Sequence, residues 1–124
     1  MSSQSDQINE LIGALSKAQA KIQSAKKDKS NPFFKSKYAD LESVWDSCRQ
    51  PLTENGIAVV QTTGIENSIL MLNTMIAHSS GQWITSKLPI ELTKKDAQGM
   101  GSALTYYRRY ALMAIAGVSA GSRS

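Results

Sequence analysis

Residues 57–90 read IAVVQTTGIENSILMLNTMIAHSSGQWITSKLPI, and this stretch decides the fold. Ile57 to Thr63 is rich in β-branched residues, which favour strands. Residues 64–68 combine Gly, Asn and Ser, which is typical of a turn. From Ile69 to His78 apolar residues fall on both faces of a strand, and this indicates a central position in a sheet. The first half of the stretch therefore predicts two adjacent strands joined by a turn.

A third strand follows directly. Ser79, Ser80 and Gly81 predict a tight turn, and residues 82–92 then alternate between the two faces of a strand. Pro89 has no backbone N–H to donate, which favours an edge position or the end of this strand. Three consecutive strands with short connections predict an antiparallel meander.

Outside this meander the apolar period becomes helical. One apolar stripe predicts a helix over about residues 6–26. A second helix begins after Asp40, a good N-cap, and Pro51 should kink or restart it. A third helix is expected over 97–118. Its predicted apolar side consists of Ala103, Leu104, Tyr107, Ala111, Ala114, Ile115 and Val118.

The predicted order is α-α-β-β-β-α, an α+β fold whose meander packs on a long C-terminal helix. Residues 1–118 are expected to form a single domain, and residues 119–124 to be a frayed or truncated tail. The whole chain has 124 residues, which is enough for one hydrophobic core.

Composition excludes several classes of protein. The single Cys cannot form an internal disulfide, and one Cys with one His cannot build a zinc site within the chain. No apolar run reaches the roughly 18 residues of a membrane helix, and the N-terminus lacks the pattern of a secretory signal. We therefore expect a soluble cytoplasmic protein with no membrane association and no cofactor.

Positive charge is concentrated in one segment. The chain has a formal net charge of +4, with 14 Lys and Arg against 10 Asp and Glu. Residues 21–37 alone carry six lysines and one aspartate, so this segment accounts for all of the excess. Such a cluster of lysines either binds phosphate groups or is a solvated surface loop. Phe33 and Phe34 lie within it and either plug the core or meet a partner.

Signs of catalysis are missing. No Walker A motif is present, which argues against nucleotide hydrolysis. Residues 99–102, Gly-Met-Gly-Ser, either offer backbone N–H groups to a phosphate or simply begin a helix. His78 is interpreted as a turn residue and Cys48 as a small core residue. We therefore expect a protein that is not an enzyme.

Arginine and tyrosine gather on the last predicted helix. Arg108 and Arg109 lie ~100° apart around a helix, so they cannot both point the same way. One would reach a phosphate while the other pairs with a carboxylate. Tyr107 falls on the predicted apolar side. Tyr106 and Tyr110 are left open between stacking on bases and packing.

Three blocks of sequence resemble the ERF (essential recombination function) family of phage single-strand annealing proteins. The first is QGMGSALTYYRRYAL at residues 98–112, the second NPFFKSKYADL at 31–41, and the third HSSGQWI at 78–84. They follow the order of the family and together extend over most of the chain.

The resemblance implies a β-β-β-α core shared with ring-forming annealing proteins, which include the eukaryotic recombination mediator. It implies homo-oligomeric rings or filaments that bind single-stranded DNA and pair complementary strands without ATP, in recombination and repair in the cytoplasm of a bacterial host. Family members usually continue into a variable C-terminal region, and any contact with a host single-strand binding protein would belong there.

We accordingly predict a DNA-binding groove formed by cationic side chains, with aromatic side chains for stacking or packing nearby. An alternative is a module that binds and protects single strands without annealing them, and a second is a structural domain with no nucleic-acid role. The predicted groove residues are Lys26, Lys27, Lys35, Lys37, Lys87, Lys94, Lys95, Arg108 and Arg109, and the aromatic ones are Phe33, Phe34, Tyr106 and Tyr110.

Overall fold

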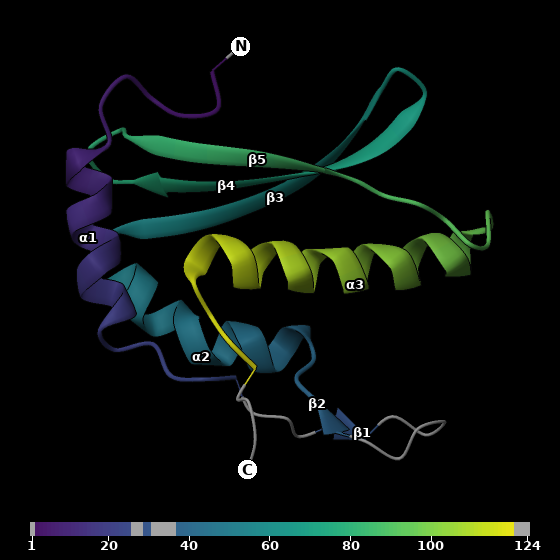
Figure 1. Ribbon diagram of the computed structural model, residues 1–124, viewed down its shortest axis with the longest axis horizontal. Helices are drawn as coiled ribbons and strands as arrows, with labels where there is room; N and C mark the ends of the chain where they lie inside the picture. Colours follow the sequence, from purple (N-terminus) through teal and green to yellow (C-terminus); the bar gives the residue numbers. More distant parts are fainter. Residues whose placement is uncertain (1, 26–28, 31–36, 121–124) are drawn as a thin grey trace.

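The computed structural model describes residues 2–25, 29–30 and 37–120, and it shows an α+β fold (Figure 1). The predicted order of the main helices and strands is confirmed, with one short strand pair added between the first two helices. The elements are α1 (Asn9–Gln19), β1 (Lys29–Ser30), β2 (Lys37–Tyr38), α2 (Leu41–Glu54), β3 (Ile57–Glu66), β4 (Ile69–His78), β5 (Trp83–Pro89) and α3 (Ala97–Ala116). Among the described residues, no helix is both long and apolar enough to cross a membrane.

The predicted meander is confirmed as a sheet with strand order β3-β4-β5, antiparallel throughout. β4 lies in the centre. The turn between β3 and β4 is tighter than residues 64–68, because β3 continues to Glu66 and pairs there with Ile69. Asn67 and Ser68 make this turn with φ values of 53° and 66°. Positive φ at both central residues matches the twist of the flanking strands, so the hairpin needs only two turn residues.

β5 forms one edge of this sheet and ends at Pro89, as the proline predicted. The N-terminal segment runs along this edge (Figure 1). Ser5 N donates to Trp83 O at 2.9 Å, and Thr85 N donates to Ser3 O at 2.8 Å. Gln4 forms an antiparallel bridge with Ile84 between these two bonds. Residues 3–5 therefore act as a short fourth strand.

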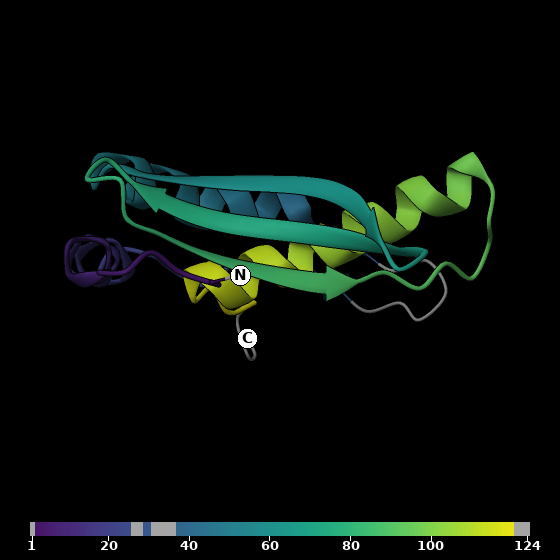
Figure 2. The same ribbon diagram turned by 90° about the horizontal axis from the view of Figure 1, so that it is seen from above.

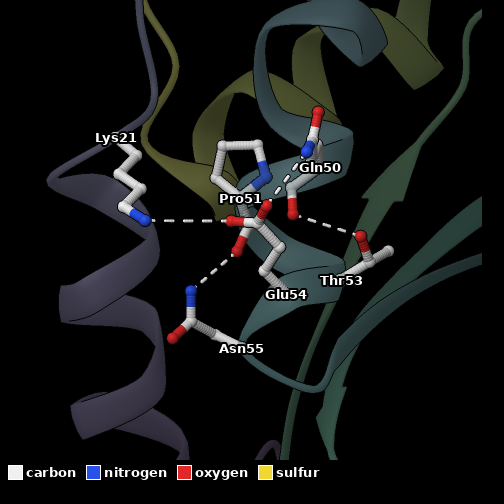
Figure 3. A network of polar contacts seen from close by, with 6 residues as sticks. All are labelled: Lys21, Gln50, Pro51, Thr53, Glu54 and Asn55. Atoms are coloured by element: carbon white, nitrogen blue, oxygen red, sulfur yellow. Dashed lines mark hydrogen bonds and ion pairs between the residues drawn. The ribbon is translucent and has the colours of Figure 1, made fainter.

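α1 is shorter than predicted, since it ends at Gln19 rather than near residue 26. α2 begins as predicted, with the Asp40 carboxylate accepting a hydrogen bond from Ser43 N at 2.9 Å. The predicted restart at Pro51 is wrong, because α2 runs without interruption to Glu54. A proline in the last turn removes only one backbone hydrogen bond, and Asn55 Nδ2 donates to the Pro51 carbonyl at 2.8 Å (Figure 3).

The helices cover one face of the sheet. Leu72 and Ile76 of β4 point to this face and are 1% exposed. Ile76 packs in one core with Leu11 of α1, Val44 of α2 and Leu112 of α3. β4 is central in the sheet, as its apolar residues on both faces predicted, although only one of these faces is covered by described helices. Seen from above, no described helix lies over the other face (Figure 2), where Ile69 and Val60 are exposed.

The predicted apolar side of α3 is confirmed only in part, since Ile115 packs against the core and Val118, just past the helix, is buried in it. Leu112 and Ala116 are its fully buried residues, whereas Ala114 of the predicted stripe is exposed. Ala114 lies about 200° around the helix from Leu112. The apolar pattern misled because alanine occurs on both sides of α3, and a small side chain is equally acceptable in the core and at the surface.

The chain stays packed beyond the boundary expected at Val118. Ala25 N donates to Ser119 O at 2.8 Å, and Ala120 packs against the core. Residues 121–124, the remainder of the expected tail, lie outside the described residues.

Cys48 is fully buried on α2, as its position on the apolar stripe predicted. Burial raises the pKa of its thiol from 9.0 to about 11, an effect that the charge of Arg49 partly offsets. The folded chain therefore keeps this proton to higher pH than the unfolded chain does.

It follows that the contribution of the neutral thiol to stability is complete below pH 9 and is lost as the pH rises towards 11. We expect the melting temperature of the wild type to fall more steeply over this interval than that of Cys48→Ala. Thermal melts followed by circular dichroism at pH 8, 9, 10 and 11 measure this. Equal slopes in the two proteins would contradict the burial of the thiol.

Two glycines in the first turns of α3 should respond oppositely to alanine. A Cβ on Gly99 would press on the Lys94 carbonyl oxygen and lie 2.7 Å from Lys94 Cβ, whereas a Cβ on Gly101 would meet nothing within 4 Å. Gly99→Ala should lower the free energy of unfolding by about 1–3 kcal/mol. Gly101→Ala should raise it by up to ~1 kcal/mol through helix propensity. Urea unfolding checks both, and a stabilising Gly99→Ala would refute the close approach.

Candidate nucleic-acid interface

The predicted cationic residues fall in three parts of the structure. Lys26, Lys27 and Lys35, with the aromatic Phe33 and Phe34, lie outside the described residues. Lys37 lies in β2, where its backbone pairs with Ser30 of β1. The others, Lys87, Lys94, Lys95, Arg108 and Arg109, are on β5, on the loop before α3 and on α3 itself.

Lys94 and Lys95 are exposed in the loop between β5 and α3. Lys94 lines a surface pocket of about 460 Å³ together with Gln98, Tyr106 and Tyr107 of α3. The loop thus brings a cation beside two aromatic rings of the helix. Lys94, a predicted phosphate-binding residue, and Tyr106, a predicted stacking residue, therefore line the same pocket.

Lys87 is less available than predicted. Its Nζ forms an ion pair with Glu66 Oε2 at 2.7 Å. β5 and β3 are both neighbours of β4, and the register places Lys87 opposite Asn73. An exposed pair of this kind contributes at most about 1 kcal/mol to stability. The Glu66 carboxylate nevertheless offsets the positive charge of Lys87, so we assign Lys87 a minor part in binding phosphates.

Arg108 points from α3 towards the covered face of the sheet. Its Nε donates to Gln61 Oε1 at 3.3 Å. Gln61 Nε2 donates in turn to the Arg108 carbonyl at 3.2 Å and to Thr74 Oγ1 at 3.1 Å. Thr74 is fully buried in β4. Arg108 therefore contacts an amide rather than a carboxylate, and its side chain helps attach α3 to the sheet.

Arg109 lies among tyrosines at the surface. Its guanidinium carbon is 4.9 Å from the ring centroid of Tyr110 and 5.4 Å from that of Tyr106, which are cation–π contacts. Tyr106 and Tyr110 are about half exposed. Arg109 Nη1 also donates to the Ala39 carbonyl at 3.4 Å, next to the start of α2. The three side chains form what we call the Arg109 cluster: Arg109, Tyr106 and Tyr110.

The two tyrosines of this cluster hold each other in place. Tyr106 Oη donates to Tyr110 Oη at 3.1 Å, and their rings meet edge to face with centroids 4.8 Å apart. This hydrogen bond is the main reason why the pKa of Tyr106 is raised. The phenol of Tyr106 is thus neutral near pH 7, and the rings of Tyr106 and Tyr110 remain partly open to a stacking partner.

The start of α3 favours the helix alternative for residues 99–102 over phosphate binding. Asp96 is the N-cap, and its Oδ1 accepts from Gly99 N at 2.7 Å. A carboxylate already occupies the position where these amides would hold an anion. A phosphate brought there would be repelled by Asp96.

Comparison with protein families matched the ERF superfamily over residues 11–122. The chain belongs to the ERF superfamily. Comparisons with curated proteins and with solved structures returned no match.

The ERF-like blocks quoted from the sequence occupy connected parts of the fold. Residues 98–112 lie within α3, and they contain the Arg109 cluster. Residues 78–84 form the turn from β4 to β5. Of the block 31–41, residues 37–41 are described, and Ala39 accepts the hydrogen bond from Arg109. Arg109 therefore joins the first of these blocks to the second.

The sequence did not lead us to predict two residues that position parts of the candidate interface, Gln61 and Asp96. Gln61 lies on the covered face of β3 and fixes the direction of Arg108, and Asp96 caps α3. The motif Asp-x-x-Gly before a helical segment was a readable signal for the cap. Nothing local marked Gln61, since its partners lie on other elements.

We predict that Gln61→Ala lowers the free energy of unfolding by about 1–2 kcal/mol, because it leaves the Thr74 hydroxyl and the Arg108 Nε without their partner. Thr63→Ala is the matched control, since Thr63 is exposed two residues along the same strand. Chemical denaturation of both variants gives the comparison. Equal losses from the two would show that the Gln61 bonds add nothing.

Proposed function

We propose that this protein binds single-stranded DNA and promotes the pairing of complementary strands without ATP. Membership of the ERF superfamily supports this role. The observation that carries the proposal is the Arg109 cluster, which presents an arginine and two half-exposed tyrosines on one surface of α3. Exposed Lys94 and Lys95 precede the same helix.

These groups match the two demands of binding a single strand without reading its sequence. Arginine and lysine neutralise phosphates and release counterions, so binding weakens as salt is added. Tyrosine rings stack on any base, because every base has a π face. No base edge needs to be bound, so the Watson–Crick edges stay free for a second strand.

The different contacts of Arg108 and Arg109 support different roles for these two arginines. Arg108 is committed to Gln61 and the sheet, whereas Arg109 lies beside exposed tyrosines. We therefore assign the phosphate contact to Arg109 and an anchoring role to Arg108.

One copy would bind weakly with so few cations. Copies placed side by side on one strand multiply the number of phosphate contacts, and the total affinity rises by avidity. Assembly is therefore part of the proposed mechanism.

The DNA-binding test compares variants that remove positive charge from different places, one charge in the single variants and two in the double lysine variant. Arg109→Ala, and separately Lys94→Ala with Lys95→Ala, should weaken binding to an oligonucleotide and reduce the salt slope by about 0.7 per lost phosphate contact. Lys17→Ala removes an exposed charge from α1 and should change neither. Fluorescence anisotropy between 50 and 300 mM NaCl measures affinity and slope, with melting temperatures as a check of folding. Unchanged slopes in both variants would refute the assignment.

The annealing step is tested with two complementary labelled oligonucleotides and no ATP. We expect the protein to increase the rate at which they pair. A protein that binds the strands and slows their pairing would be a protective binder instead. One that leaves the rate unchanged would have neither role.

A further inference from the structure

The two edges of the sheet differ in a way that suggests how copies join. The β5 edge is occupied by residues 3–5 of the same chain. The β3 edge has no strand beside it within the described residues. β3 is 10 residues long, carries one charged side chain, Glu66 at its end, and contains no proline. Natural sheets usually blunt a free edge with charges, proline or a covering loop.

The register identifies the backbone groups that this edge leaves unpaired. Ser79 N donates to Gly56 O at 3.0 Å, in the position adjacent to the pair Ile57–His78. Hydrogen-bonded pairs alternate along an antiparallel ladder. Even-numbered residues of β3 therefore bond to β4, and the odd-numbered ones point outward. The outward N–H and C=O groups belong to Ile57, Val59, Gln61, Thr63 and Ile65, and no backbone hydrogen bond to them occurs in the described part of the chain.

The opposite edge of the molecule is complementary. Ser3 O and Ser5 N are used on β5, so the backbone groups of Gln4 between them point outward. Gln4 is exposed. A second chain that approaches this edge could therefore form backbone hydrogen bonds with the N–H and C=O groups of Gln4.

The number of strands makes these two edges compatible. Residues 3–5 run antiparallel to β5, and β5, β4 and β3 alternate in direction. Residues 3–5 and β3 therefore run in opposite directions. When a second copy is placed head to tail in the same orientation, its N-terminal segment lies antiparallel to β3 of the first. Without residues 3–5, β5 of the second copy would lie beside β3 of the first, and these two strands would be parallel.

A pocket and a positive charge beside the start of β3 are consistent with this head-to-tail arrangement. A pocket of about 240 Å³ lies beside the start of β3 and is lined by Trp45, Arg49, Ile57 and Val59, among others. Arg49 stacks on Trp45 at 5.0 Å. An antiparallel segment pairing with β3 would run with its Asp6 directed towards this end of the strand, where Arg49 places a positive charge. Asp6 is exposed in the isolated chain.

We propose that copies of this chain join head to tail by pairing residues 3–6 of one copy with the outer edge of β3 of the next. A head-to-tail contact repeats and builds a ring or a filament. The inference deepens the proposed function, which needs copies side by side. The test below measures the assembly of copies and not DNA binding. A failure of this inference can therefore be distinguished from a failure of the proposed function.

Two proline variants remove one edge each without touching a hydrogen bond inside the chain. Thr63→Pro deletes an outward N–H of β3, and Gln4→Pro deletes the outward N–H of the N-terminal segment. Thr63→Ala and Gln4→Ala retain these groups and are the controls. Sedimentation velocity without DNA and with an oligonucleotide measures assembly, and circular dichroism monitors folding.

We expect the wild type and the alanine controls to form large assemblies and each proline variant to be monomeric. Mixing the two proline variants should give a 1:1 dimer, because each retains the edge that the other has lost. A symmetric β3–β3 contact predicts instead that Gln4→Pro still assembles and that mixing adds nothing, which would overturn the proposal. A wild type that is monomeric with and without DNA would also overturn it.

If Thr63→Pro does not fold, Ile65→Lys replaces it, because a lysine blunts an edge strand. Ile69→Lys is its control, with the same charge in the same hairpin but on the central strand. Loss of assembly in Ile65→Lys alone supports the proposal, and equal behaviour of the two variants contradicts it.

Discussion

The burial of β4 against α3 and α1 is the contact on which the rest of the structure depends. Leu72 and Ile76 supply the sheet side, and Leu112 lies in the same core as Ile76. Each fully buried side chain of this size stabilises the fold by ~1.5–3 kcal/mol. The contact also fixes the rotation of α3 about its own axis. With Leu112 facing inward, Arg108 is directed to the sheet, and the Arg109 cluster is left at the surface.

The strands were predictable because their signals are local. β-branched residues and turn residues succeed one another between Ile57 and Pro89, and each acts on its immediate neighbours in sequence. The N-cap Asp40 was equally readable. The buried side of α3 was only partly predictable, since alanines occur on both sides of that helix and the three-dimensional packing decides which of them are covered. The restart predicted at Pro51 was wrong for a related reason. The free energy that a proline costs a helix depends on how close it lies to the helix end, and Pro51 lies in the last turn of α2.

The candidate interface was predictable in its residue types but not in its pairings. The run Lys94-Lys95 lies at the surface, as a polar break between a strand and a helix indicates. The ion pair of Lys87 with Glu66 joins residues on two strands, and it can be foreseen only once the register is known. The difference between Arg108 and Arg109 likewise follows from contacts with Gln61 and Ala39, which are distant in sequence.

The fully buried Cys48 leaves the chain without an exposed thiol among the described residues. Its raised pKa keeps it protonated near neutral pH, and only the thiolate reacts readily with electrophiles. A maleimide dye would consequently label a cysteine introduced on the surface while sparing the native one. Energy transfer between dyes on neighbouring chains then becomes accessible in an otherwise unaltered sequence.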